Sequence, residues 1–215
     1  MTSQKDYWDK KITEWSSASY GRKSSISFLE KVATYFRSVD KRKDAAIKII
    51  SPLIKNKVIL DLGCGLGEFA FGILRYKPKK VIALDISPNA VKQARLFAKK
   101  KKIHGKVRFE VSDVVKTKKL PESDIVIGLG FIDYLTLPQL KNLFRMIGKK
   151  PYLFSCFEKK FSLFNLLHNI YLISQNCPGA YKHTRSEIRN IVPKGMKLSF
   201  ITKDGLLFIT NLHES

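Results

Sequence analysis

The stretch VILDLGCGLGEFA, Val58–Ala70, decides the fold, because it reads as a buried strand that runs into a glycine-rich turn. Its apolar first half has the length of a strand and ends at a glycine. Three glycines, Gly63, Gly65 and Gly67, then alternate with other residues, and a helix is expected over 68–75. The stretch therefore predicts a strand–turn–helix unit whose turn lets a ligand lie close to the backbone.

Strand and helix continue to alternate along the chain. Further strands are predicted at KVIALDI, KVRFEVSD, SDIVIGLG and PYLFSCF, and helices at SPNAVKQARLFAKKKK and LPQLKNLFRMIGKK. This spacing predicts a doubly wound α/β fold, with a mostly parallel sheet and helices on both faces. Near the C-terminus, KLSFITKDGLLFITNL has two strand-like runs around Asp204-Gly205, a strong hairpin signal. The sheet should therefore end in an antiparallel pair.

The first quarter of the chain is predicted to be helical. Trp8, Ile12 and Trp15 recur at the spacing of one helix face, and two further helices are expected over 26–36 and 43–54.

The length of 215 residues suits one domain with a real core. We divide it into an N-terminal helical segment, 1–55, and a main domain, 56–215, with an insert around 158–192.

The charge balance favours anionic partners. Forty Lys and Arg residues against eighteen Asp and Glu give a net charge of +22. Such a field attracts nucleic acid, an anionic membrane surface or an acidic substrate. The basic residues are spread over the whole chain, so a lysine-rich surface without a binding role fits as well. Three cysteines without CxxC spacing and four scattered histidines give no metal-ligand pattern, and no metal is expected.

The N-terminal stretch MTSQKDYWDKK lacks the apolar core of a signal peptide, so a cytoplasmic protein is expected. The longest apolar stretch, Phe161–Ser174, falls short of the ~20 residues of a spanning helix. It has three possible roles: a core helix, a roof over an apolar substrate pocket, or a peripheral membrane contact in which Lys159 and Lys160 meet anionic lipid.

The residues around the glycine turn argue against a phosphate-bearing ligand. A dinucleotide site of GxGxxG type needs a third glycine where Glu68 stands, and its carboxylate would repel a pyrophosphate. Asp61 suits a cationic group instead. Asp85 follows the second strand, 18 positions beyond Gly67, where an acid accepts ribose hydroxyls, and Asp113 follows the third strand. S-adenosylmethionine, with its ribose, sulfonium and amino-acid tail and no phosphate, accounts for this pattern.

Four motifs, VILDLGCGLGEFA, VIALDISPNAVKQAR, VRFEVSDV and DIVIGLGFIDYL, together resemble the class I, seven-stranded S-adenosylmethionine-dependent methyltransferases. The resemblance spans roughly residues 55–155 and implies the strand order 3-2-1-4-5-7-6 with strand seven antiparallel. It also implies that the helix at YWDKKITEWSSASYGR is a lid, which makes residues 1–55 an N-terminal helical lid. In its fourth motif and fifth strand, the chain is similar to small-molecule methyltransferases of the quinone and porphyrin type.

The resemblance implies a set of cofactor-binding residues. The glycine loop would pack on the methionine part, the second-strand acid on the ribose, the third-strand residues on the adenine, and the fourth strand under the sulfonium. Position by position, these are Tyr20, Asp61, Gly63, Cys64, Gly65, Gly67, Asp85, Ile86, Ser87, Asp113, Val114, Gly128 and Leu129. For Asp113 a turn role, and for Tyr20 ordinary packing, stay open.

The implied reaction is in-line transfer of the methyl group to a nucleophile, in which the protein supplies alignment. A base is needed only where the nucleophile must lose a proton. The candidates are Asp133, Tyr134 and His183, each of which also fits a structural role. The expected acceptor is an oxygen or nitrogen atom of a small or lipid-like molecule, with a carbon atom as the less favoured alternative. Methylation of tRNA or rRNA, favoured by the net charge, and a non-catalytic cofactor-binding module are the alternatives.

Overall fold

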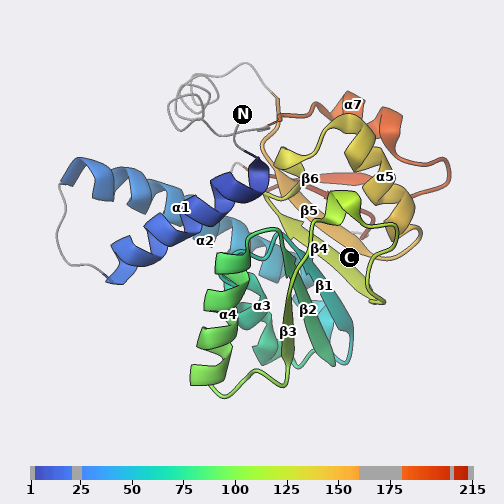
Figure 1. Cartoon of the computed structure of the whole chain (residues 1–215). Coiled ribbons are helices and arrows are strands. Elements are labelled where there is room, and N and C mark those ends of the chain that lie inside the picture. Colours follow the sequence, from blue (N-terminus) through green and yellow to red (C-terminus); the bar gives the residue numbers. More distant parts are fainter. Residues whose placement is uncertain (1–2, 21–25, 160–180, 204–205, 213–215) are drawn as a thin grey trace.

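The structure, a computed structural model, describes residues 3–20, 26–159, 181–203 and 206–212, with the backbone alone for 13–20 and 26–39. Seven strands form one sheet in the order β3-β2-β1-β4-β5-β7-β6 (Figure 1). The strands are β1 (Val58–Leu62), β2 (Lys80–Asp85), β3 (Val107–Val111), β4 (Ile125–Leu129), β5 (Tyr152–Cys156), β6 (Ser199–Lys203) and β7 (Leu206–Thr210).

The strand directions confirm the predicted mixed sheet. The first five strands pair in parallel, whereas β7 is antiparallel to both β5 and β6. The predicted C-terminal hairpin is therefore present, although its turn residues 204–205 lie outside the described residues. Because β1 and β4 are neighbours while their connections diverge, the carboxyl ends of the central strands form the edge where ligands bind in such sheets.

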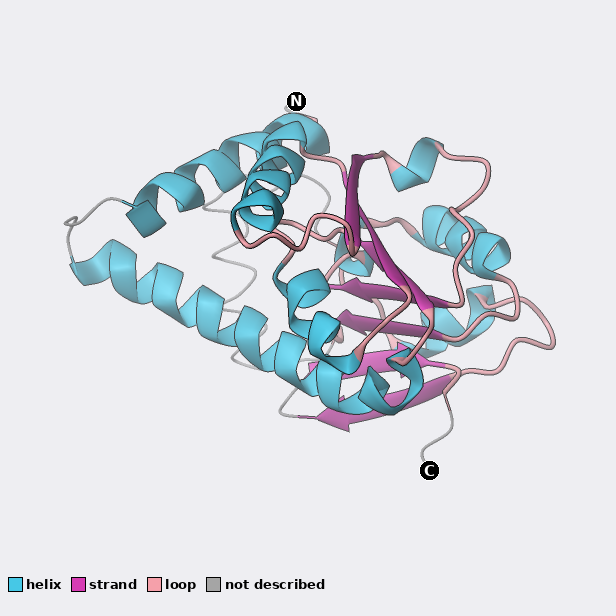
Figure 2. Cartoon of the chain, turned by 90° about the horizontal axis from the view of Figure 1, so that it is seen from below, coloured by secondary structure: helices cyan, strands magenta, loops and turns pink. Residues whose placement is uncertain are grey.

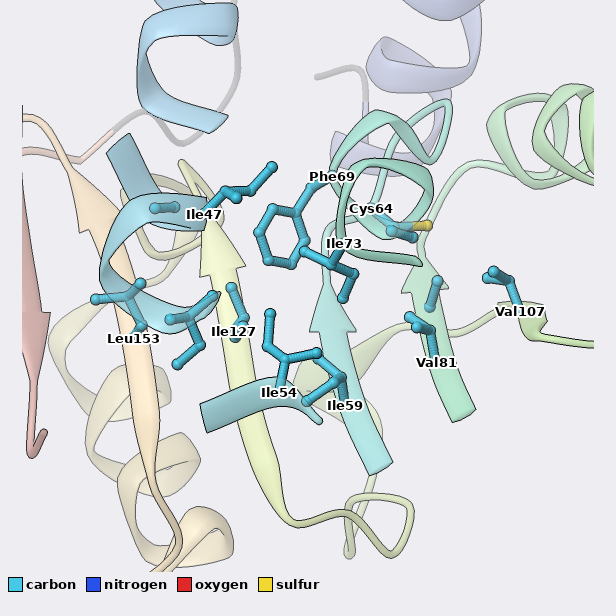
Figure 3. Close-up of a cluster of buried hydrophobic side chains, with 14 of the residues drawn as sticks. Ile47, Ile54, Ile59, Cys64, Phe69, Ile73, Val81, Val107, Ile127 and Leu153 are labelled. Carbon is cyan, nitrogen blue, oxygen red and sulfur yellow. The ribbon is translucent and has the colours of Figure 1, made fainter. Parts of the chain in front are cut away.

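Helices cover both faces of the sheet, because successive strand residues point to opposite sides. The helices are α1 (Gln4–Tyr20), α2 (Ile26–Ile54), α3 (Glu68–Gly72), α4 (Pro88–Lys100), α5 (Leu137–Ile147) and α7 (Arg185–Ile191), with short 3-10 turns η1 (Ile73–Tyr76), η2 (Val114–Lys116) and η3 (Ile132–Tyr134); they lie on both sides of the strands (Figure 2). Ile59 belongs to a core cluster with α2, α3 and α4 (Figure 3). Leu60 and Leu62 belong to a second cluster with α5 and α7.

The N-terminal part differs from the prediction, since the two helices expected over 26–36 and 43–54 form the single helix α2. Its second half lies in the core, through Ala45, Ala46, Ile47, Ile50 and Ile54. Its first half and α1 project beyond the sheet in both views (Figures 1 and 2). Asp40 and Lys41, which lie between the two predicted helices, are exposed on a continuous helix.

The helix expected over 68–75 is also shorter than predicted. It ends at Gly72 as α3 and continues as the 3-10 turn η1. None of the described helices is long and apolar enough to cross a membrane. The apolar stretch 161–174 and most of the predicted insert 158–192 lie outside the described residues.

Candidate functional site

The glycine loop after β1 leaves open space above its backbone. Gly63, Gly65 and Gly67 all have positive φ angles, of 71°, 53° and 85°, which L-residues with a side chain rarely adopt. A Cβ at Gly65 would meet no atom within 4 Å, whereas one at Gly67 would lie 2.7 Å from the Phe109 ring. The loop is therefore packed tightly at the start of α3 and open at Gly65.

The loop is fastened to the end of β2. The backbone N–H groups of Gly63 and Cys64 donate to the Leu84 carbonyl at 2.8 and 3.0 Å. The Gly65 N–H donates to Asp85 Oδ2 at 2.8 Å, so the loop and the predicted ribose acid are in direct contact.

Asp85 keeps capacity for a ligand. Its Oδ1 accepts the Ser87 N–H at 2.9 Å, and the Ile86 N–H also acts on the carboxylate. A carboxylate has about four acceptor positions, so at least one is left for a ribose hydroxyl. Burial raises the pKa of Asp85, and its backbone hydrogen bonds act in the opposite direction. The neighbouring Ile86 is half-buried, as a residue that packs on an adenine would be.

Asp61 is a buried carboxylate with an unsatisfied oxygen. Strand alternation places it on the same face as Ile59, where it is 2% exposed. Its Oδ2 has no hydrogen-bond partner among the described residues. Burial, and secondly the negative charge of Asp85, raise the pKa of Asp61 to about 7. An unpaired buried carboxylate costs free energy that a cationic ligand group would offset.

Two further predicted cofactor residues have their side chains engaged within the protein. Asp113 begins η2, where Oδ1 accepts the Val115 N–H at 3.2 Å and Oδ2 pairs with Lys116 at 3.3 Å. Ser87 caps α4: it accepts the Ala90 N–H and donates to Asp9, and it is fully buried. A direct cofactor role for these two side chains stays a prediction, as does one for the buried residues Cys64 and Val114.

Phe131 links the glycine loop to the end of β4. A Cβ at Gly63 would lie 3.0 Å from Phe131 Cδ2, and one at Gly128 would lie 3.3 Å from Phe131 Cβ. Gly128 also accommodates the Phe154 ring of β5, since a Cβ there would be 2.9 Å from it. Leu129, which follows on β4, is half-buried. Gly128, one of the residues predicted to lie under the sulfonium, is therefore connected to the glycine loop through the Phe131 side chain.

The three candidate bases share one neighbourhood. The Tyr181 N–H donates to the Asp133 carbonyl at 2.6 Å, and His183 Nε2 lies 3.0 Å from the Leu135 carbonyl. Because a carbonyl can only accept, Nε2 of the buried His183 is a donor and does not serve as a base at that atom. Tyr134 lies between these residues on η3.

Asp133 is buried, and its Oδ1 accepts the Phe157 N–H at 2.9 Å. Burial raises the pKa of Asp133 to about 6, although the charge of Arg42, the Phe157 hydrogen bond and the charge of Lys182 each lower it.

The first turns of α1 lie at the carboxyl edge of the sheet. Asp9 accepts from the Ser87 hydroxyl at 2.6 Å and the Asn89 N–H at 2.8 Å, at the start of α4. The adjacent Trp8 ring meets the Tyr134 ring of η3 edge-on at 4.9 Å. Tyr20 is the last residue of α1, and its side chain is not among those described.

Sequence reasoning missed two residues of this edge, Asp9 and Arg42. Arg42 lies three and four positions before Ala45 and Ala46, which are core residues of α2, so helical spacing could have placed it on the buried face. Asp9 had no such signal, because its partners are on α4.

A cavity of about 210 Å³ adjoins this region between η2 and α5. Its lining residues are Val114, Val115, Leu135, Pro138, Gln139, Asn142, Leu143 and Met146. Within the described ranges, no group of three or more His, Cys, Asp and Glu residues could hold a metal ion.

The glycine loop and its carboxylates fit the proposed cofactor. Gly65 is open above its backbone, Asp85 has at least one free acceptor position, and the unsatisfied Asp61 oxygen suits a positive group. Asp61 and Asp85 would hold the cofactor there. A pyrophosphate would instead face two carboxylates.

Solved structures share this fold over about three quarters or more of the chain. Magnesium protoporphyrin IX methyltransferase from Synechocystis PCC 6803 with bound SAH is 17% identical, with a TM-score of 0.68 over 97% of this chain and 98% of that one. The same enzyme with bound SAM gives 15% identity and a TM-score of 0.66, over 99% of each chain. The YcgJ protein of Bacillus subtilis is 16% identical, with a TM-score of 0.60 over 74% of this chain and 69% of that one.

A family model described as a methyltransferase domain matches residues 53–189. This range begins at the end of α2, contains β1 to β5 and ends within α7. The chain therefore belongs to the methyltransferase domain family, in its class I, seven-stranded form.

Proposed function

We propose that this protein transfers a methyl group from S-adenosylmethionine to an oxygen or nitrogen atom of a small-molecule acceptor. The observation that carries the proposal is the buried, unsatisfied Asp61 oxygen beside Asp85 at an open glycine loop. S-adenosylmethionine supplies an activated methyl group on a positively charged sulfur. Asp85 would accept the ribose hydroxyls, and Asp61 would compensate the positive charge.

The protein's own contribution is alignment and exclusion of water. Holding two reactants in attack geometry can lower a barrier by about 7–11 kcal/mol. The Gly63 loop, Phe131 and the end of β4 form one contiguous wall for this purpose. Asp133, Tyr134 and His183 remain the candidates for accepting a proton from the acceptor, with His183 restricted to its Nδ1 atom because Nε2 donates to a carbonyl.

Two observations support a small acceptor. Phe131 and Phe154 fill the space around Gly128, so the fourth strand ends in a narrow, largely apolar setting. The solved structures that cover nearly the whole chain belong to an enzyme named for a porphyrin acceptor. RNA is the second candidate acceptor, favoured by the net charge of +22.

Calorimetry with S-adenosylmethionine and S-adenosylhomocysteine tests the cofactor site. We expect Asp85→Ala to weaken both ligands by about 10- to 150-fold, because hydrogen bonds to a charged group contribute about 1.5–3 kcal/mol. Asp124→Ala is the matched control: it removes the same charge from a residue that accepts the Val58 N–H at the other edge of the sheet. Wild-type affinity in a folded Asp85→Ala protein would refute the ribose assignment.

A methyl-labelling experiment separates the acceptor classes. The purified protein is incubated with methyl-labelled S-adenosylmethionine and with the small-molecule, lipid and RNA fractions of a cell extract. We expect label in the small-molecule or lipid fraction. Label confined to RNA would replace the first candidate with the second.

A further inference from the structure

Arg42 is a buried arginine whose charge the described residues do not neutralise by direct contact. It is 8% exposed, and its Nε has no hydrogen-bond partner among them. The ion pairs found in the described part of the chain do not include it. Buried charges are normally paired, because an unpaired one forfeits its hydration without compensation. The carboxylate of Asp133 acts on Arg42 electrostatically without forming an ion pair, so the guanidinium has room for a directly bonded partner of opposite charge.

The guanidinium lies at the carboxyl ends of β4 and β5. Gly130 directly follows β4 with a φ of 72°, and a Cβ there would overlap Arg42 Nη1. The Arg42 Cζ atom is 4.8 Å from the centre of the Phe157 ring, which directly follows β5. An aromatic ring that covers one face of a guanidinium leaves its in-plane N–H donors available for a planar anion.

The nearby carboxylates leave room for such an anion. Glu158 is bound by Arg185 at 2.8 Å. Asp133 Oδ1 accepts the Phe157 N–H, and Oδ2 lies 3.8 Å from the position of a Gly130 Cβ. The pKa of Asp133 is already raised to about 6 by burial, and a neighbouring anion would raise it further. Asp133 would then be protonated near neutral pH and could donate its O–H to the anion.

Arg42 is close to the glycine loop. Gly63 and Gly128 both contact Phe131, and Phe131 is adjacent in the chain to Gly130, where the guanidinium lies. An anion on Arg42 would therefore be next to the end of β4, which the proposed function assigns to methyl transfer.

We propose that Arg42 binds an anionic oxygen group of the methyl acceptor, a carboxylate or a phosphate, and thereby positions the acceptor beside the cofactor. This inference rests on the proposed function and names the substrate class of the same site. The planar guanidinium suits two parallel hydrogen bonds to such a group, which a lysine could not make. Arg42 is thus a positioning and specificity residue, and it takes no part in proton transfer.

Binding of three simple probes tests this role. Octanoate, octyl phosphate and neutral octanamide are titrated calorimetrically into the protein saturated with S-adenosylhomocysteine. We expect at least one anion to bind tenfold or more tightly than octanamide, and the comparison of the two anions identifies which oxygen group is preferred.

The variants separate a binding role from a structural one. Arg42→Met should abolish the preference for the anion, Arg42→Lys should keep part of it, and Arg145→Met, which removes an exposed arginine of α5, should leave it unchanged. The affinity for S-adenosylhomocysteine should be the same in all four proteins.

Three results would overturn the inference: equal binding of octanamide and both anions to the wild type, no binding of any probe, or an unchanged preference in Arg42→Met. A wild-type protein that fails to bind S-adenosylhomocysteine would instead contradict the proposed function. Thermal unfolding of each variant verifies that it is folded.

Discussion

At the scale of single residues, Asp61 shows how strand geometry sets a protonation equilibrium. Alternation along β1 directs its carboxylate into the buried face, and the pKa rises from 3.8 to about 7. The folded protein then binds more protons than the unfolded chain between about pH 4 and pH 7. Stability therefore falls as the pH rises through this window and is level above it.

We predict that Asp61→Asn raises the free energy of unfolding at pH 8, by up to about 4 kcal/mol, because a shift of about three pKa units no longer opposes folding. At pH 4 the variant should have no such advantage, since Asp61 is then largely protonated in the wild type. Denaturant unfolding at both pH values measures the difference. If Asp61→Asn were instead less stable than the wild type by the same amount at pH 8 and at pH 4, the prediction would be wrong. The Asp61 carboxyl group would then have a stabilising contact that the structure does not show.

The glycine loop and its acids were predictable from sequence for a local reason. Positive φ angles at Gly63, Gly65 and Gly67 are a property of the backbone, and only glycine adopts them without strain. Asp85 follows from its place at the end of a recognisable strand. Arg42 was not predictable as a site residue, because its importance depends on Gly130 and Phe157, which are far away in the chain.

At the scale of elements, α1 is held at the ligand edge of the sheet by contacts from its first turns. Asp9 binds the first turn of α4, where the helix dipole also favours a negative charge. Gln4 Nε2 donates to the Tyr134 carbonyl at 3.0 Å, beside the contact between Trp8 and Tyr134. Among the described residues, the docking of α1 thus includes the polar contacts of Gln4 and Asp9, the ring contact of Trp8 and the buried side chain of Ile12.

We predict that Asp9→Ala loosens α1 and weakens S-adenosylmethionine by about tenfold, since charged hydrogen bonds of about 1.5–3 kcal/mol are lost at the α4 terminus. Hydrogen–deuterium exchange should increase in Gln4–Tyr20 and stay unchanged in α5. Asp6→Ala is the control on the same helix, because the hydrogen bonds of Asp6 are to Ser3 at the start of α1 and not to α4. Equal effects of the two substitutions would contradict a specific role for Asp9.

The element boundaries that the sequence missed have a physical cause. The two predicted helices within α2 are one because its polar middle lies where the helix leaves the sheet, and exposed polar residues there cost little. In contrast, the C-terminal antiparallel pair, which the local Asp204-Gly205 signal indicates, was predicted correctly, since β6 and β7 are antiparallel. Local signals were thus reliable, whereas tertiary surroundings decided the rest.

At the scale of the whole molecule, the charge of +22 makes weak binding to nucleic acid an expectation whatever the acceptor is. We predict that a fluorescent oligonucleotide binds with an affinity that falls by tenfold or more between 50 and 200 mM salt, about the range for several phosphate contacts. No methyl label should enter the oligonucleotide. A salt-independent affinity, or methylation of the RNA, would show that the binding is not merely electrostatic.

The absence of a side chain at Gly130, where a Cβ would overlap the Arg42 guanidinium, has a consequence for the comparison of related chains. A side chain after the fourth strand and an arginine in this helix turn exclude each other, so the two positions should change together during divergence. Chains that keep both residues should share a preference for acidic acceptors, and chains that replace the glycine should have lost it. The residues at the positions of Arg42 and Gly130 could then predict the substrate class of related chains before any assay is performed.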